Sequence, residues 1–386
     1  MLEAGSVSNR AYKFALLDRR KMTARNAALD SLTGLRWWAA FAVFFFHMTA
    51  FAPLPIFPLF EYGNFGVMFF FVLSGFVLSW SWKAELPIRA FYLRRFGRIW
   101  PSAFVALLIA IPVFYSFAPD PSQWWVKPFD FGILLLSVPL IQGWWLAPAI
   151  LFSGNPAAWT LTCEFFFYSL HPILQRGYVR IASRWVILAL LVVFLGLVSI
   201  KSSCLLITGQ PCTPLPLPIE RLPEFVIGMG IGVLAKRGLL LPISPWFPLG
   251  VLGALYGYLA FGAFLHVPTG LLQISTQFAN EITLLLMALT IAAVAQKDIS
   301  GKNTGFRAPW LIRLGEVSFT FYLVHATVMY LFVDFFGQLD VSWKNAIWYP
   351  LVLTAGLLLA FALHIWVEKP FESKIRRFSD RISLSR

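Results

Sequence analysis

Three apolar stretches of the chain contain ionisable side chains that acid–base chemistry could use. Arg36 and His47 lie in GLRWWAAFAVFFFHMTAF, Glu164 and Tyr168 lie in AWTLTCEFFFYSLHP, and His325 lies in LGEVSFTFYLVHATV. An imidazole can take up or release a proton near neutral pH, and a carboxylate can pair with an imidazolium or a guanidinium. Because such groups are unfavourable in an apolar environment, each of them needs a partner or a role.

The spacing of Arg36 and His47 places both side chains on one helix face. They are eleven residues apart, which is close to three turns of an α-helix, or about 16 Å along its axis. Each residue also has a structural explanation. An arginine at a membrane boundary often anchors the helix, and a buried histidine often bonds to a neighbouring helix. The shared face nevertheless favours a functional site.

Two further sets of polar residues follow helical spacing. Glu164 and Tyr168 are an i,i+4 pair, and Ser318, Tyr322 and His325 follow i,i+4,i+7 spacing. We expect Glu164 to lie close to a cation or a histidine, either in a site or in an ion pair that only locks helices together.

These sets are predicted to converge on one depth of the membrane. We expect Glu164 to lie at a depth similar to that of His47, with His171 and His325 nearby, so that three histidines and one carboxylate surround one site. Such a cluster could place a proton acceptor beside a reacting group.

Arg94, Arg95 and Arg98 form a basic cluster in FYLRRFGRIWP. The cluster either sets the orientation of the protein in the membrane or receives phosphates. A basic entrance next to buried histidines suits a molecule with an anionic end in the cytoplasm and a reactive end in the membrane. A long acyl thioester such as acyl-CoA has this shape.

The composition requires that membrane helices position these residues. The chain of 386 residues is 59% hydrophobic, 17% aromatic and only 13% charged, which excludes an ordinary soluble protein. We predict an all-α, polytopic bundle in the cell membrane. Its ten predicted spans are residues 35–52, 66–82, 99–117, 159–175, 185–203, 219–235, 246–265, 277–296, 314–336 and 347–367.

The distribution of basic residues predicts that both termini are cytoplasmic. With ten spans, all but four of the 31 lysines and arginines face the cytoplasm; the exceptions are Lys127, Lys201, Arg221 and Lys344. The apolar stretch 131–145 is either an eleventh span or an interfacial segment, and the charge distribution favours the latter. The net charge of +13 then reflects topology and lipid contact and not nucleic-acid binding.

We divide the chain into a basic cytoplasmic segment (1–28), a membrane domain (29–371) and a basic cytoplasmic tail (372–386). Cys204 and Cys212 fall in one predicted outer loop, where they either form a disulfide or remain free thiols. We expect no metal site.

The polar stretches belong to a series of ordered signatures that resembles the acyltransferase-3 family of integral-membrane O-acyltransferases. They are LDSLTGLRWWAAFAVFFFH, GVMFFFVLSGFVLS, FYLRRFGRIWP, AWTLTCEFFFYSLHP, RLPEFVIGMGIG, LGEVSFTFYLVH and VEKPF. The resemblance covers residues 29 to about 371. It implies transfer of an acyl group, often acetyl, from cytoplasmic acyl-CoA to a hydroxyl, commonly on a sugar, with acyl-CoA as co-substrate and no further cofactor.

The resemblance also implies roles for single residues. His47 would be the catalytic base and Arg36 a donor-binding or charge-pairing residue, while Trp159 and Glu164 match the family's tryptophan and glutamate. The catalytic candidates are His47, Glu164 and His325. The candidates for binding donor or acceptor are Arg36, Arg94, Arg95, Arg98, Trp159, Tyr168, Ser318, Tyr322, Arg221 and Glu224.

Several functions stay open at this point. The chain shows no C-terminal hydrolase-like domain and is similar to stand-alone macrolide and antibiotic-sugar acyltransferases, so a macrolide or glycoside is the expected acceptor. A cell-envelope glycan is the alternative acceptor. A proton-coupled transporter and a non-catalytic export partner are the competing classes. Direct transfer and a route through acyl-His47 are both possible mechanisms.

Overall fold

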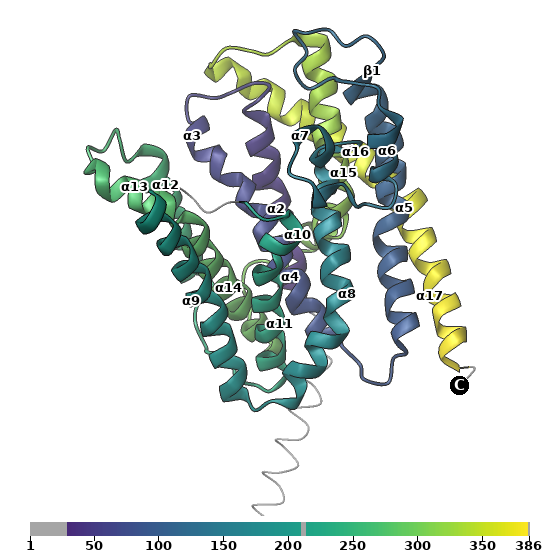
Figure 1. The fold of residues 1–386 in the computed structure, drawn as a ribbon, viewed down its shortest axis with the longest axis vertical. Coiled ribbons are helices and arrows are strands. Elements are labelled where there is room, and N and C mark those ends of the chain that lie inside the picture. The colour runs from purple at the N-terminus through teal and green to yellow at the C-terminus, as the bar shows by residue number, and fades with distance from the viewer. Residues whose placement is uncertain (1–28, 210–213, 385–386) are drawn as a thin grey trace, which may run out of the picture.

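The computed structural model describes residues 29–209 and 214–384. In this part of the chain, one long helix lies at each of the ten predicted spans (Figure 1). These helices are α2 (Asp30–Met48), α4 (Gly66–Ser81), α5 (Ile88–Phe114), α8 (Trp159–Arg180), α9 (Ser183–Thr208), α11 (Leu222–Lys236), α12 (Trp246–Phe261), α14 (Ala279–Ile299), α15 (Pro309–Phe336) and α16 (Trp348–Leu363).

The remaining elements are short, apart from α17 (Lys369–Leu384). They are α3 (Phe57–Phe60), η1 (Glu61–Phe65), β1 (Tyr115–Ser116), β2 (Lys127–Pro128), α6 (Phe131–Ser137), η2 (Gln142–Trp144), α7 (Pro148–Leu151), η3 (Pro156–Ala158), α10 (Leu217–Glu220), α13 (Thr269–Gln277), η4 (Trp343–Ile347) and the π-helical η5 (His364–Glu368). The two strands pair in parallel over two residues each.

The protein is a helical membrane bundle. Among the described residues, six helical segments are long and apolar enough to cross a bilayer by themselves. Others are shorter; α11, for example, has 15 residues and α12 has 16. Ten crossings therefore stay a prediction. The stretch 131–145 contains only the seven-residue α6 and the turn η2, too short to span a bilayer, so it is not an eleventh span.

Glycines allow the central helices to pack closely. A Cβ atom on Gly228 of α11 would lie 1.9 Å from the carbonyl oxygen of Val72 in α4, and one on Gly75 would lie 2.0 Å from that of Phe225. Between α2 and α15, a Cβ on Gly315 would lie 1.8 Å from the Thr33 carbonyl oxygen. Small residues at these positions let membrane helices make backbone contact.

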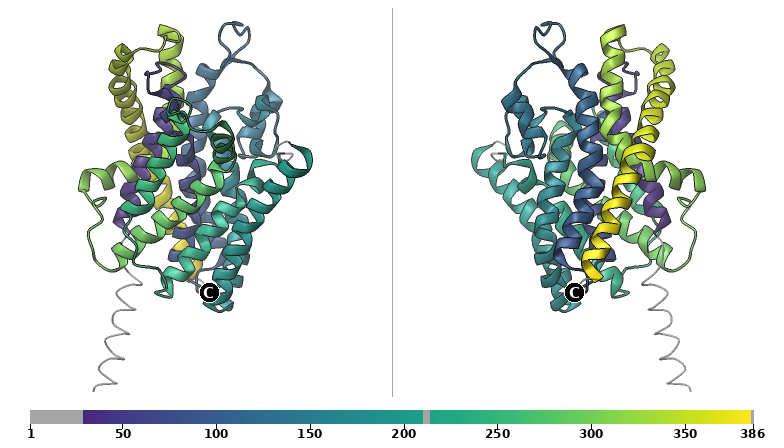
Figure 2. Two further views of the ribbon diagram at one scale, coloured as in Figure 1. Left: turned by 90° about the vertical axis from the view of Figure 1, so that its left-hand side faces the viewer. Right: turned by 90° about the vertical axis from the view of Figure 1, so that its right-hand side faces the viewer.

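The C-terminal segment is part of the bundle and not a separate tail. The chain continues from α16 through η5 into α17, which runs beside α5 (Figure 2). Gly97 of α5 is covered by Ile375, and Arg94 pairs with Asp380 at 2.6 Å. The boundary that we placed at residue 372 therefore falls inside a packed helix.

The two ends of the bundle differ in architecture. The α8–α9 turn and the C-terminal end of α17 lie at one end, which we call the basic end because Arg94, Arg95, Arg180 and Arg237 lie there (Figure 1). Residues 115–158, which we call the strap, cross the opposite end with β1, β2 and several short helices. The strap and α8 bring the predicted site residues of distant segments together.

Candidate active site

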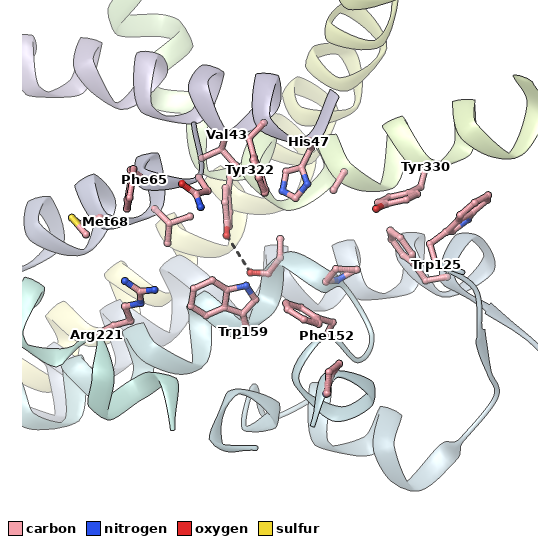
Figure 3. Close-up of a pocket in the computed structure, with 18 of the residues that line it drawn as sticks. Val43, His47, Phe65, Met68, Trp125, Phe152, Trp159, Arg221, Tyr322 and Tyr330 are labelled. Atoms are coloured by element: carbon pink, nitrogen blue, oxygen red, sulfur yellow. Dashed lines mark hydrogen bonds between the residues drawn. The ribbon is translucent and has the colours of Figure 1, made fainter. Parts of the chain in front are cut away.

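A cavity of about 740 Å³ lies beneath the strap, and we call it the main cavity. His47 of α2, Trp159 at the start of α8 and Tyr322 of α15 line its middle (Figure 3). Arg221 lies toward one end, and Trp125 and Tyr330 lie toward the other (Figure 3). Its wall is mostly apolar with a few polar groups, as in small-molecule binding sites.

The rings of His47 and His325 lie side by side, with their centroids 5.1 Å apart. His325 is 1% exposed, and its Nδ1 lies 2.9 Å from the Tyr322 carbonyl oxygen and 3.1 Å from that of Phe321. Because a carbonyl oxygen only accepts, Nδ1 carries the proton and Nε2 bears the lone pair. This Nε2 has no hydrogen-bond partner among the described residues. His47 faces the cavity, and His325 stands behind it as a proton acceptor.

The strap holds the wall opposite His47 in place. Asn155 is buried, donates to the Leu323 carbonyl oxygen at 2.7 Å and caps the Ala157 amide through Oδ1 at 3.1 Å. The hydroxyl of Tyr322 points to the Ala157 carbonyl oxygen at 3.5 Å (Figure 3). The Asn155 bonds set the start of α8, and with it Trp159, against α15.

A small cavity of about 70 Å³ adjoins the main cavity and contains Arg36 and Glu164. Val67, Phe71 and Tyr322 line both cavities, so the two share a wall. Among the described residues, the Arg36 guanidinium makes no hydrogen bond and no ion pair within 4.0 Å. The charge of Glu164 nevertheless acts on it. Arg36 is therefore a cation available to a ligand between the basic end and His47.

Glu164 lies with the arginines and not with the histidines. Tyr168 donates to Glu164 Oε2 at 3.0 Å, and the charges of Arg36, Arg95 and Arg98 act on the carboxylate. Glu164 forms no ion pair within 4.0 Å among the described residues, so its predicted proximity to a cation stays a prediction. The expected common depth with His47 is wrong, because α8 begins at Trp159 beside the main cavity and Glu164 is more than one turn further toward the basic end.

A third cavity, of about 260 Å³, opens at the basic end and is the basic cavity. Its cations are Lys83, Arg94, Arg95 and Arg376, and Glu372 is its carboxylate. Arg95 has no hydrogen-bond or ion-pair partner among the described residues, and its charge acts on Glu164. The three cavities thus follow one another from the basic end to His47.

Two predicted phosphate ligands are instead engaged in ion pairs with the C-terminal helices. Arg98 lies 2.6 Å from Glu368 and 2.9 Å from Glu372, and Glu368 also contacts His364 Nδ1 at 2.5 Å. Arg94 donates to Ser379 at 3.0 Å as well as pairing with Asp380. Of the predicted arginine cluster, Arg95 is the member free to bind a ligand.

Comparisons with known proteins identify the family of the chain. The Acyltransferase domain family, acyltransferase-3, matches residues 29–365. The chain belongs to this family. The chain is 34% identical over 331 residues to "Acyltransferase MdmB" of Streptomyces mycarofaciens, covering 80% of this chain and 81% of that protein. It is 26% identical over 185 residues to "Peptidoglycan O-acetyltransferase OatA" of Listeria monocytogenes, covering 44% of this chain and 28% of that protein. No solved structure matches it significantly.

Two residues of the acyltransferase do not take the predicted places. His171 stacks on Phe91 and meets Trp82 edge-on, each at 5.3 Å between ring centroids, away from His47 and His325. Ser318 is fully buried and donates to the Gly315 carbonyl oxygen at 2.7 Å, so its hydroxyl serves the helix backbone. The prediction that three histidines and a carboxylate converge is wrong; two histidines do.

The acyltransferase has site residues that sequence reasoning missed. Lys127 of β2 lines the main cavity and donates to the Phe152 carbonyl oxygen. Lys83 and Arg376 line the basic cavity. Lys127 could have been found from the predicted topology, which places it outside the cell. A single lysine on the outer side does not help to orient the protein in the membrane, so another role was to be expected. Arg376 could not be found while α17 was taken for a tail.

Two other expectations concern a metal and a disulfide. Within residues 29–209 and 214–384, no group of three histidine, cysteine or acidic side chains could hold a metal ion. Cys212 lies outside the described residues, so the choice between a Cys204–Cys212 disulfide and free thiols stays open.

Proposed function

We propose that this acyltransferase moves an acyl group from acyl-CoA to a hydroxyl of a sugar, a macrolide or another glycoside. The observation that carries the proposal is the sequence of cavities. A cationic cavity at the basic end, an unpaired arginine beside it and a histidine facing a large apolar cavity follow one another. The shape suits a donor that is anionic at one end and reactive at the other.

The donor would enter from the basic end. Its phosphates would bind Arg95, Lys83 and Arg376, and Arg36 would bind a polar group of the donor's arm near Glu164. Glu164 would hold Arg36 in place, with Tyr168 fixing the carboxylate. The basic end would face the cytoplasm, where acyl-CoA is found, as the distribution of basic residues predicts.

In the proposed reaction, His47 takes the proton of the acceptor hydroxyl while its oxygen attacks the thioester carbonyl carbon. The carbonyl oxygen becomes an oxyanion in the tetrahedral intermediate, and the Tyr322 hydroxyl, which lines the main cavity, would turn from the Ala157 carbonyl oxygen to stabilise it. The carbon–sulfur bond then breaks, and the CoA thiolate receives the proton from the His47 imidazolium. The lone pair of His325 Nε2 stabilises this imidazolium and orients His47.

The experiment is a thiol-release assay with the purified full chain. Several acyl-CoAs are incubated with a panel of sugars, glycosides and macrolides, and free CoA is measured with and without acceptor. The proposal requires acceptor-dependent thiol release with at least one pair. Uptake of a substrate into vesicles without acyl-CoA consumption would instead indicate a proton-coupled transporter.

A cell-envelope glycan is the second candidate acceptor. The similarity to "Peptidoglycan O-acetyltransferase OatA" favours it, although the chain spans only 28% of that protein. Including peptidoglycan fragments in the acceptor panel separates the two candidates, because only a glycan-specific enzyme would prefer them over small glycosides.

A further inference from the structure

The main cavity has a polar end that the proposed reaction does not require. Arg221 and Glu224 lie there, and Arg221 Nη1 donates to Glu224 Oε1 at 3.0 Å. Glu224 is 4% exposed. Glu224 Oε2 and Arg221 Nε are buried and have no hydrogen-bond partner among the described residues. The pair therefore offers one unused acceptor and one unused donor to whatever fills the cavity.

Buried polar atoms without hydrogen-bond partners are unfavourable, so a ligand that bonds to both atoms would stabilise this end of the cavity. The charges around Arg221 indicate which kind of ligand can bind. Glu220 lies 3.8 Å from the same guanidinium, so two carboxylates surround one arginine. This end has no excess positive charge and does not favour a phosphate or a carboxylate. A neutral hydroxyl, which both donates and accepts, fits the two unused atoms.

The side chains around Arg221 and Glu224 are of the kinds that bind a sugar ring. Trp159 and Met68 lie beside Arg221 (Figure 3), and the amide side chains of Asn64 and Asn280 line the same cavity. An aromatic face can pack on the C–H face of a sugar, while amide and charged groups bind its hydroxyls. The end with Trp125 and Tyr330 is apolar apart from Lys127.

We infer that Arg221 and Glu224 form a subsite for a neutral, polyhydroxylated ring of the acceptor. Glu224 Oε2 accepts a hydrogen bond from one ring hydroxyl, and Arg221 Nε donates to another ring oxygen. The apolar remainder of the acceptor lies toward Trp125 and Tyr330, so that a hydroxyl between the two parts meets His47. The inference rests on the proposed function for the reaction, but the binding site can be tested without turnover.

The test compares a glycoside with its aglycone. The full chain in nanodiscs is titrated with 4-methylumbelliferyl glycosides of several neutral hexoses and with free 4-methylumbelliferone, and binding is followed by probe fluorescence. The variants are Glu224→Ala and Glu224→Gln. The matched control is Glu281→Ala, because Glu281 also pairs with a basic side chain, Lys201 at 2.9 Å, and does not line the cavity.

We expect at least one glycoside to bind the wild-type protein more tightly than the aglycone by about tenfold or more. Glu224→Ala and Glu224→Gln should abolish that preference, whereas Glu281→Ala keeps it even if its thermal stability falls. Preserved preference in a folded Glu224→Ala protein, or no preference in the wild type, overturns the inference. Sugar binding without any acyl-CoA consumption would overturn the proposed function and leave the subsite standing.

Discussion

His325 is the residue whose ring contacts bear most directly on the proposed base. Its Nδ1 proton is bound by backbone carbonyl oxygens, so only Nε2 is left to act on His47, 5.1 Å away between ring centroids. In this position it resembles the orienting member of a triad, which holds the base and stabilises its protonated form.

We expect His325→Ala to lower kcat by less than the roughly 10²–10⁴-fold contributed by base catalysis, with little change in either KM. The pH profile of kcat should also shift, since in the proposed reaction the lone pair of His325 Nε2 stabilises the His47 imidazolium. Thr320→Ala is the control, because Thr320 is buried on the same helix and donates only to the Val317 carbonyl oxygen. An unchanged pH profile would mean that His325 is only a packing residue.

Arg36 and Arg95 are the cations expected to bind the donor. Removing either should raise the KM for acyl-CoA by about tenfold or more, because a hydrogen bond to a charged group contributes roughly 1.5–3 kcal/mol. The KM for the acceptor should stay unchanged. Arg176→Ala is the control, since Arg176 is exposed at the basic end and lines none of the three cavities. Equal effects of all three variants would point to a general surface charge effect.

At the level of elements, close contact between α4 and α11 holds the wall of the main cavity. Gly228→Ala should lower the thermal stability markedly, because the new Cβ would lie 1.9 Å from the Val72 carbonyl oxygen and overpacking costs about 1–3 kcal/mol. Gly250→Ala in α12 is the matched control, since nothing lies within 4 Å of its Cβ. If thermal unfolding in detergent shows equal stability for both variants, the helices are not held by this contact.

The positions of the helices could be predicted from the sequence, whereas the contacts of the polar residues could not. Long apolar runs dictate helices in a bilayer, so a helix overlaps each of the ten predicted segments, although α5 begins at Ile88, eleven residues before the predicted start. The partner of Arg98 depends on α17, whose polar composition looks like that of a solvated tail. The start of α8 was predicted correctly at residue 159, but the depth of Glu164 depends on how deeply the strap places this start in the bundle, and a stretch without periodicity gives no such signal.

At the level of the whole molecule, the predicted orientation puts the basic end in the cytoplasm and the strap outside. Ser122→Cys in the strap should react with a membrane-impermeant thiol reagent in intact cells, and Ser300→Cys after α14 should react only after permeabilisation. Both serines are exposed. The parent protein serves as the blank. The reverse pattern would invert the topology and move donor entry to the other face.

The central claim is that His47 is the base of an acyl transfer, and acceptor-dependent thiol release by His47→Ala tests it most directly. His47 lines the main cavity, and the unpaired lone pair of His325 lies behind it. We predict that the variant loses turnover by at least about 10²-fold while acyl-CoA binding and the unfolding temperature stay close to those of the wild type. A folded His47→Ala protein that releases thiol at a near-normal rate would contradict the account.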